Sequence, residues 1–309
     1  MQRSTPIAAG KAVTKSATTA AWRRLPTGVG TTRAACRRSF IGAALVGAVL
    51  MTGCQAPAPV ADGVVVAPTI GEVRRVLAPT GELRIAVYAG SPTSLVRRPG
   101  SDEVRGVSVD IGRALAGRLG VPARLVELER VEQVVDAVSR GQADMTITNA
   151  TAARAARVDF TEPLLALELG FLAMPGSPVE VLSDTDRAGV RIGVSQGSSS
   201  QAALGAALRA ASLVPAASLK EAAEMLKDGR IDAFATNKGI LNQLADGLPG
   251  ARILDGRWGT ESLAIAVPKG REAGRVWLAG FAAAVRADGQ VQRAADRAGL
   301  RGLAEPEAP

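Results

Sequence analysis

Short apolar runs alternate with segments of helical periodicity along most of the chain. Residues 83–94 and 190–201 both contain Arg-Ile, a small residue and Val, followed by a turn rich in Gly and hydroxyl groups. Residues 108–120, 130–141 and 218–229 each place their apolar side chains on one helical face. Apolar runs that alternate with helices favour parallel α/β units.

The ends of the predicted helices carry their own signals. In 108–120 the apolar face is formed by Ile111, Ala114, Leu115 and Leu119, and Gly120 is expected to end the helix. In 218–229, Ser218 is the expected N-cap, and Glu221 three residues later completes a capping-box pattern.

Each half of the chain contains a short segment that ends in the same polar pair. Residues 141–149 and 229–237 begin with Gly, have Asp three residues later, continue as a β-rich run and end in Thr-Asn. Because ligands bind outside the carboxyl ends of strands in open α/β sheets, we expect two similar lobes that share a cleft. Thr and Asn also favour turns, so a single pair could merely end its strand. The occurrence of the pair in both halves favours a binding site.

The basic charge of the chain lies in its leader. The formal net charge is +8, which would suggest nucleic acid or an anionic surface as partner. Residues 1–53 hold no acidic residue, and their basic residues are Arg3, Lys11, Lys15, Arg23, Arg24, Arg33, Arg37 and Arg38. Without them the basic and acidic residues are equal in number, so we expect no nucleic acid partner.

Residues 1–53 are typical of an export signal. A basic region ends at Arg37 and Arg38, and the uncharged run 40–51 is too short to span a bilayer. The run closes with Met-Thr-Gly-Cys, which resembles a bacterial lipoprotein cleavage box with Cys54 as the lipid acceptor. Residues 37–42, Arg-Arg-Ser-Phe-Ile-Gly, also resemble a twin-arginine signal, and an ordinary export signal is the alternative. Residues 54–78 are expected to be the lipidated Cys and a tether, because 55–68 is rich in Pro and Ala.

Cysteine and histidine usage removes several chemistries. The chain has no His and two Cys residues, of which Cys36 would leave with the leader and Cys54 would be acylated. We therefore expect no disulfide, no thiol nucleophile, no metal site and no cofactor. The lack of His excludes Ser-His-Asp catalysis. Carboxylate-based catalysis, with Glu162 or Glu261 as acid or base, is the alternative to a protein without catalytic residues.

Several segments resemble the solute-binding proteins of ABC importers, in particular the family that binds polar amino acids. They lie in family order from about Gly81 to Leu300 and are residues 81–87, 106–121, 151–165, 190–200, 226–241 and 263–270. The resemblance implies two α/β lobes joined by two crossover strands, of periplasmic binding protein type II, with a ligand cleft between them. Residues 169–176 and 262–270 suit the crossovers.

The same resemblance implies the binding residues. Thr151 and Arg154 keep the family's spacing before Asp-Phe-Thr, where the arginine pairs with the ligand's α-carboxylate. The serines at 198–200 match a turn whose hydroxyls and helix amides hold the same group. A surface arginine and simple N-capping are the alternatives. The expected ligand-binding residues are Ser91, Ser94, Asn149, Thr151, Arg154, Ser198, Ser199, Ser200, Asn237 and Lys238.

Three departures bear on the ligand. Asn237 stands where the family has an Asp that holds the α-ammonium group, and residues 90–94 replace an aromatic wall. The segment 144–151 is also shorter than usual. We therefore hypothesise a carboxylate or dicarboxylate without an amine. The few aromatic residues disfavour sugar binding. Trp258 could approach the cleft or the hinge, or it could pack between a lobe and its linker.

The sequence thus predicts a monomeric, lipid-anchored, extracytoplasmic protein of the cell envelope. It would capture a small polar or anionic solute by lobe closure and deliver it to an ABC permease in the membrane. A lipoprotein that reports to a membrane sensor is one alternative, and a dehydratase-like enzyme on the same fold is another. The expected divisions are 1–53, 54–78, lobe 1 at 79–168, lobe 2 at 169–261, a return to lobe 1 at 262–304, and a tail at 305–309.

Overall fold

The computed structural model describes residues 68–98 and 100–304. These residues belong to one structural unit of the chain. The expected export signal, the lipid acceptor Cys54, most of the tether and the tail at 305–309 lie outside them.

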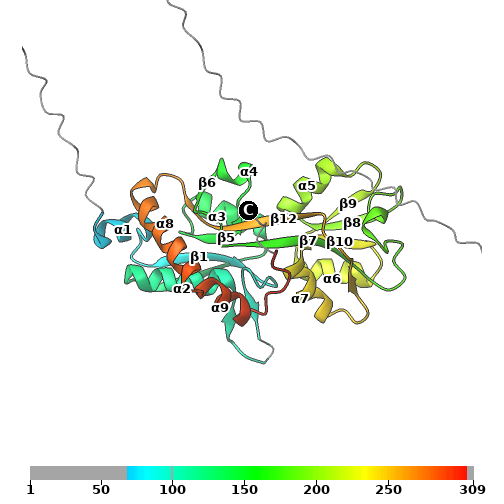
Figure 1. Ribbon diagram of the computed structural model, residues 1–309, viewed down its shortest axis with the longest axis horizontal. Helices are drawn as coiled ribbons and strands as arrows, with labels where there is room; N and C mark the ends of the chain where they lie inside the picture. Colours follow the sequence, from blue (N-terminus) through cyan, green and yellow to red (C-terminus); the bar gives the residue numbers. More distant parts are fainter. Residues whose placement is uncertain (1–67, 99, 305–309) are drawn as a thin grey trace, which may run out of the picture. The chain divides into compact units, whose positions relative to one another are not determined.

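Two groups of helices and strands are joined by two long strands, β7 (Leu165–Ala173) and β12 (Gly259–Pro268) (Figure 1). The elements of lobe 1 are α1 (Ile70–Leu77), β1 (Leu83–Tyr88), β2 (Val96–Arg97), β3 (Val104–Arg105), α2 (Val107–Leu119), β4 (Ala123–Leu128), α3 (Val131–Ser139), β5 (Thr146–Asn149), α4 (Ala152–Ala155), β6 (Val158–Phe160), α8 (Glu272–Ala287) and α9 (Gln290–Arg297). The elements of lobe 2 are a 3-10 helix (Leu182–Asp184), β8 (Arg191–Ser195), α5 (Ser199–Ala207), β9 (Ser212–Ala216), α6 (Leu219–Lys227), β10 (Ala233–Asn237), α7 (Lys238–Asp246) and β11 (Arg252–Ile253).

The sheets confirm the predicted α/β class. β1 pairs with β4 in parallel, and β8 pairs in parallel with both β9 and β10, so each lobe contains the predicted parallel unit. The larger sheet has the order β5-β12-β7-β10-β8-β9. β12 is antiparallel to β5 of lobe 1 and to β7, and β7 is antiparallel to β10 of lobe 2. The two crossover strands therefore connect the lobes through one continuous hydrogen-bonded sheet, and both begin a few residues before the segments expected from the sequence.

The predicted helices form close to their expected limits. Helix α2 ends at Gly120, which adopts the left-handed conformation that an L side chain rarely takes. Ser218 caps α6 by accepting a hydrogen bond from the Glu221 amide at 3.1 Å. The Glu221 carboxylate accepts from the amide of Ala217 at 2.7 Å instead of from Ser218, so the predicted capping box is only half formed.

Residues 70–77 differ from the expected tether, because they form helix α1. Thr69 and Glu72 make a complete capping box at its start, and Val73 and Leu77 are buried in the core of lobe 1. Arg271 also donates to the Leu77 carbonyl oxygen at 2.8 Å. The amphipathic pattern of this helix covers only two turns, which is too short to stand out beside a Pro- and Ala-rich segment.

The core of lobe 1 also includes the last two helices. Leu278, Phe281 and Val285 of α8 and Val291 of α9 are buried with side chains from α1, α2 and β1. This is the expected return of the chain to the first lobe. Among the described residues, no helix combines the length and the apolar character needed to cross a bilayer.

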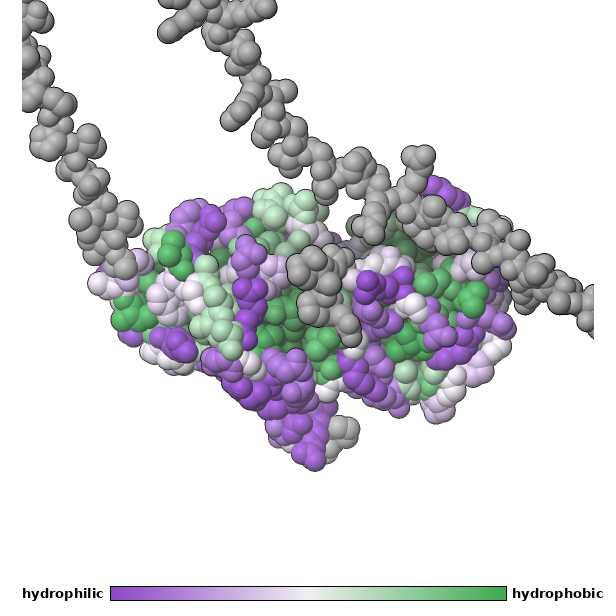
Figure 2. Space-filling model, in the orientation of Figure 1, coloured by the Kyte–Doolittle hydropathy of each residue, from purple (hydrophilic) through white to green (hydrophobic). Residues whose placement is uncertain are grey.

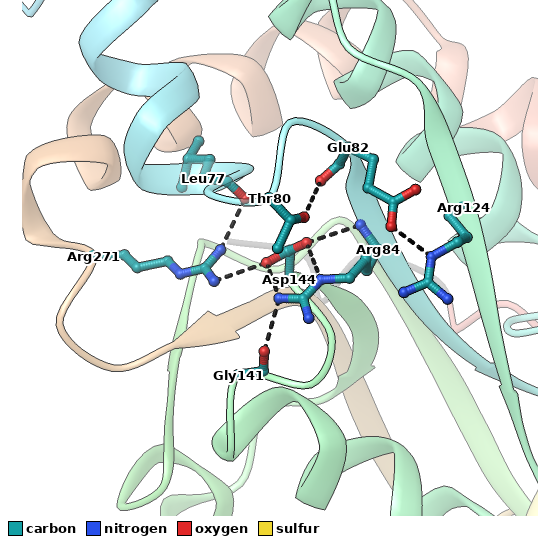
Figure 3. A network of polar contacts seen from close by, with 8 residues as sticks. All are labelled: Leu77, Thr80, Glu82, Arg84, Arg124, Gly141, Asp144 and Arg271. Atoms are coloured by element: carbon teal, nitrogen blue, oxygen red, sulfur yellow. Dashed lines mark hydrogen bonds and ion pairs between the residues drawn. The ribbon is translucent and has the colours of Figure 1, made fainter.

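The Asp of the repeated Gly-x-x-Asp motif forms an ion pair at the start of each lobe's central strands, and Figure 3 shows the pair of lobe 1. In lobe 1, Asp144 accepts hydrogen bonds from the Arg84 amide at 2.9 Å and from Arg84 Nη2 at 2.8 Å. In lobe 2, Asp232 accepts from the Arg191 amide at 2.7 Å and from Arg191 Nη2 at 2.7 Å. Each pair ties the arginine of the first strand to the residues that precede the second strand, so the same motif is needed twice.

Polar side chains dominate the hairpin formed by β2 and β3, which projects at the bottom of the space-filling view (Figure 2). Arg97, Arg98, Asp102 and Glu103 of this segment are all exposed. The hairpin lies outside the set of residues that line the cleft described below.

Candidate binding cleft

A polar cleft is lined by residues of both lobes and of β12. Its space outside protein atoms, open solvent included, is about 590 Å³. Lobe 1 contributes Tyr88, Thr93, Glu129, Arg130, Val131, Thr148, Asn149 and Arg154. Lobe 2 contributes Ser195, Ser198, Ser199, Ser200, Ala216, Ala217, Ser218, Leu219, Thr236, Asn237 and Ile240, and β12 contributes Glu261 and Leu263.

Both Thr-Asn pairs therefore line one cleft, as the repeat predicts. Thr148 and Asn149 end β5, and Thr236 and Asn237 end β10. The side chain of Asn149 also crosses between the lobes, donating to Ser199 Oγ at 3.1 Å. The carboxyl ends of the two strands thus supply polar groups from opposite sides.

Arg154 lies at the cleft on the short helix α4. Thr151 caps this helix and accepts from the Arg154 amide at 3.3 Å. The guanidinium donates through Nη1 to Thr148 Oγ1 at 2.7 Å and to the Asn149 carbonyl oxygen at 3.4 Å. Nε and Nη2 have no hydrogen-bond partner among the described residues, so one edge of the guanidinium fork is free to bind a ligand carboxylate.

The neighbouring arginine behaves differently. Arg157 is exposed and pairs with Asp136 at 2.5 Å. It does not line this cleft, although it borders an adjoining hollow that Arg154, Ser198 and Ser199 also line. Burial lowers the pKa of Arg154, and the nearby Glu261 and Tyr88 oppose this effect. Arg154 therefore places its positive charge in a partly desolvated site, where a nearby anion stabilises the charged form.

The N-terminus of α5 lies at the same cleft. Ser198 caps the helix and accepts from the Gln201 amide at 3.0 Å. The first amides of a helix lack intrahelical acceptors, and here they belong to Ser199 and Ser200, which line the cleft. N-capping and a polar lining thus coexist at Ser198–Ser200.

Glu261 of β12 is the acidic side chain buried in this cleft. The residue is 7% exposed, and its Oε1 accepts a hydrogen bond from Asn237 Nδ2 at 2.7 Å. Asn237 Oδ1 accepts from the Ile240 amide at 3.0 Å, which fixes the amide with its NH₂ group toward Glu261. Burial raises the pKa of Glu261 to about 7, against the opposing effects of Asn237 and Arg154. The carboxyl is therefore poised to change its charge near neutral pH.

Four of the expected binding residues do not line the cleft. Ser91 shares a hydrogen bond with Thr93 Oγ1 at 2.8 Å, and Ser94 Oγ accepts from the Tyr88 amide at 2.8 Å. Thr151 caps α4. Lys238 donates to Glu168 at 2.6 Å. These contacts organise the loop after β1, helix α4 and the strand junction, and Tyr88 and Thr93 line the cleft where the two serines were expected.

The residues missed by sequence reasoning include Arg130, Tyr88 and Glu261. The sequence indicated Glu261 only as an acid or base in the alternative that the protein is an enzyme. Strand alternation could have revealed it, because Glu261 shares the inward face of β12 with Leu263 and Ile265. Nε of Arg130 is buried and has no hydrogen-bond partner among the described residues.

Trp258 packs away from the cleft, on the side of lobe 2. Its indole Nε1 donates to the Gly170 carbonyl oxygen at 3.1 Å, and its ring lies 6.2 Å from that of Phe171. Its own amide donates to the Leu169 carbonyl oxygen at 3.0 Å, directly before β12 begins. Trp258 therefore packs between the lobe and its linker, beside the crossover strands, and does not line the cleft.

Solved structures of solute-binding proteins share this fold. The solute receptor for L-cysteine of Neisseria gonorrhoeae is 25% identical, with a TM-score of 0.66 over 77% of this chain and 100% of that one. An amino acid ABC transporter substrate-binding protein from Streptococcus pneumoniae, bound to L-arginine, is 20% identical, with a TM-score of 0.65 over 76% and 99%. An ancestral amino acid-binding protein, a precursor of cyclohexadienyl dehydratase, is 21% identical, with a TM-score of 0.63 over 74% and 99%.

Comparison with curated protein sequences gives no significant match. The sequence profile of one family matches residues 83–299, which is most of this 309-residue chain. The matched region holds both lobes except helix α1, both crossover strands and every residue that lines the cleft. The protein therefore belongs to the bacterial extracellular solute-binding proteins, family 3, whose members serve ABC transporters.

Proposed function

We propose that this protein is a lipid-anchored solute-binding protein that captures a small carboxylate-bearing solute between its lobes and delivers it to an ABC permease. The observation that carries the proposal is the pairing of Arg154, with one free guanidinium edge, and the N-terminus of α5 at one cleft. The first comes from lobe 1 and the second from lobe 2. A carboxylate bound by both would hold the lobes together, which is the basis of capture by closure.

The relatives support an amino acid or a similar carboxylate as the solute. The structural neighbours include proteins that bind L-cysteine and L-arginine. The proposed contacts here are Arg154, Ser198, Ser199, Ser200, Asn149 and Asn237, all of which line the cleft. The other four expected residues would act indirectly, through contacts that hold the loop after β1, helix α4 and the strand junction in place. They are Ser91, Ser94, Thr151 and Lys238.

Ligand binding is tested by thermal unfolding of the full chain against L-amino acids, dicarboxylates, oxo acids and inorganic anions. A ligand at about 100 times its dissociation constant adds roughly 2.7 kcal/mol to the free energy of unfolding. Arg154→Ala should weaken binding by roughly 1.5–3 kcal/mol, because a charge-assisted hydrogen bond to the ligand is lost.

Arg157→Ala is the matched control, since this arginine lies close in sequence but outside the cleft lining. It should leave the ligand-induced shift unchanged. Equal effects of the two substitutions, or no shift with any compound, would refute the proposed site. The bound compound should also be recovered unchanged after incubation, and its chemical conversion would favour the enzyme alternative.

Anchoring by Cys54 rests on the sequence motif alone. Cys54→Ser is expected to move the protein from the membrane fraction to the soluble extracytoplasmic fraction, because the lipid acceptor is lost. Fractionation followed by immunodetection measures this. Unchanged membrane association of the variant would contradict the anchor without affecting the proposed cleft.

A further inference from the structure

The C-terminal end of the described chain touches both lobes beside a crossover strand. After α9, residues 300–304 run along the edge of β7 (Figure 1). The Glu168 amide donates to the Gly302 carbonyl oxygen at 3.0 Å. The Ala304 amide donates to the Ala166 carbonyl oxygen at 2.9 Å. We call residues 300–304 the strap.

The strap is fixed in lobe 1 and meets helix α7 of lobe 2. Leu300 is 8% exposed and belongs to the core of lobe 1. Its side chain also faces the start of α7, where a Cβ atom added at Gly239 would lie 2.5 Å from Leu300 Cδ1. Gly302 has a φ of +79°, and a Cβ atom added there would overlap Lys238 Cβ. The two glycines therefore let strap and helix approach until no clearance is left between them.

On this edge of β7, one residue lies between the partners from the two lobes. Asn237 of β10 pairs with Leu169, whereas Leu303 of the strap lies opposite Leu167. Glu168 stands between them, bonded to the strap through its amide and to lobe 2 through its carboxylate. A rotation of lobe 2 against lobe 1 at β7 therefore changes the gap between the strap and α7.

The strap meets α7 on the face of the sheet away from the cleft. Glu261 of β12 lines the cleft and lies opposite Leu167 in the register, so these two side chains share a face. Glu168 follows Leu167 on β7 and points to the opposite face, where it accepts from Lys238 Nζ at 2.6 Å. Lys238 is also the residue against which the strap packs. The crossover strands therefore lie between the cleft and this contact.

The lobes touch on the cleft side as well. Asn149 Nδ2 donates to Ser199 Oγ at 3.1 Å, and a Cβ atom added at Gly197 would lie 2.5 Å from Glu132 Cβ. The crossover strands are the pivot between these contacts and those of the strap. A rotation that parts the cleft contacts therefore drives α7 towards the strap, and close-packed groups give way little.

We infer that the strap is a stop that limits how far the cleft opens. For a wider opening the strap has to leave the edge of β7 and give up both of its hydrogen bonds to that strand. Arg301 of the strap also pairs with Asp246 of α7, but both side chains are about half exposed, and such pairs contribute little. Steric contact is thus the main restraint. The inference concerns the motion of the lobes and holds whichever solute binds between them.

The experiment measures distances between the lobes in the full chain without added ligand. Spin labels are attached at Ala153→Cys on α4 and Ala203→Cys on α5, two exposed positions on opposite sides of the hollow beside the cleft. Cys36 and Cys54 are replaced by Ser, and pulsed electron spin resonance gives the distance distribution. Deletion of residues 301–309 removes the stop, so the distribution should broaden and extend to longer distances.

Deletion of residues 305–309 is the matched control, because it leaves the strap whole. Arg301→Ala is a second control, because it removes the ion pair and keeps the steric contact. Both variants should keep the distribution of the parent protein. An unchanged distribution after deletion of 301–309 in a protein that is folded by circular dichroism would overturn the inference. An effect of Arg301→Ala equal to that of the deletion would also overturn it, since the ion pair would then be the restraint.

Gly302→Ala tests the stop with the opposite sign and with every residue of the strap present. The added Cβ atom takes the space of Lys238 Cβ and pushes α7 away from the strap, so the cleft side should close and the label distances should shorten. Longer distances would show that the strap yields instead of α7, and unchanged distances would show that the contact has clearance. Either result would overturn the stop. Because the labels report on the protein without added ligand, neither result bears on the proposed binding of a carboxylate.

Discussion

The two lobes use the same ion pair at the same place in their fold, but in different surroundings. In lobe 1 the Asp144 side chain is fully buried and Arg84 is 13% exposed, whereas in lobe 2 Asp232 is 11% and Arg191 42% exposed. Lobe 1 adds a second arginine, since Arg271 Nη2 donates to Asp144 at 2.8 Å (Figure 3). The same sequence motif therefore forms a buried ion pair in one lobe and a partly exposed ion pair in the other.

The difference follows from the path of the chain. Arg271 precedes α8, which follows the crossover strand β12 and packs with α1 in lobe 1. Arg271 therefore joins the first helix to Asp144, the carboxylate that binds Arg84 of β1. Among the described residues of lobe 2, no comparable segment returns to bind Asp232. Burial alone would raise the pKa of Asp144, but hydrogen bonds from Arg84 and Arg271 outweigh it and lower the pKa.

The largest effect is expected for Asp144→Asn. The change leaves two arginines beside a neutral amide in a buried place, and breaking such a pair costs about 3–5 kcal/mol of unfolding free energy. Chemical denaturation at neutral pH measures the loss. Because the folded-state pKa of Asp144 is lowered, its contribution is complete above the ordinary carboxyl pKa and is lost as the pH falls through the folded value. The difference between the two proteins should therefore shrink in acid, and a difference that grows there would contradict this role.

Asp232→Asn should have a smaller effect, roughly 1–3 kcal/mol, because the released Arg191 is half exposed and regains water. The same denaturation measurement applies. A loss equal to or greater than that of Asp144→Asn would break the comparison, since it would show that Arg271 adds nothing. A reduction to the smaller value for Asp144→Asn in an Arg271→Met background would sharpen it, because only Arg84 would then remain beside the amide, as Arg191 does in lobe 2.

Much of the architecture could be predicted from the sequence because it is repeated. Two copies of strand, helix and Gly-x-x-Asp indicate two lobes, and the polar ends of β5 and β10 meet at one cleft as expected. Arg154 was identified through a resemblance in spacing, and its environment supports that role. Helix α1 was missed although Thr69 and Glu72 carry a local capping-box pattern, because its amphipathic pattern covers only two turns and its contact with Arg271 comes from a residue 194 positions later.

The site was harder to predict than the fold. Lys238 follows Asn237 directly, but α7 begins there and the lysine turns to Glu168, so sequence proximity to a binding residue did not bring it to the cleft. Glu261 is 24 residues from Asn237 in sequence. The two side chains meet because β10 and β12 both pair with β7, one on each side of it. Side-chain pairs formed across strands of different lobes depend on register, which composition and periodicity do not encode.

The position of Trp258 gives the protein an optical reporter. The only other tryptophan of the described residues, Trp277, stacks on Phe281 in helix α8, with ring centroids 6.1 Å apart, remote from the strand junction. Trp258 instead stands where β12 leaves lobe 2, bonded to the backbone of β7. Movement of the two crossover strands against lobe 2 would alter the polarity around one indole and leave the other unchanged. Its emission spectrum can therefore follow the motion of the hinge without an added dye.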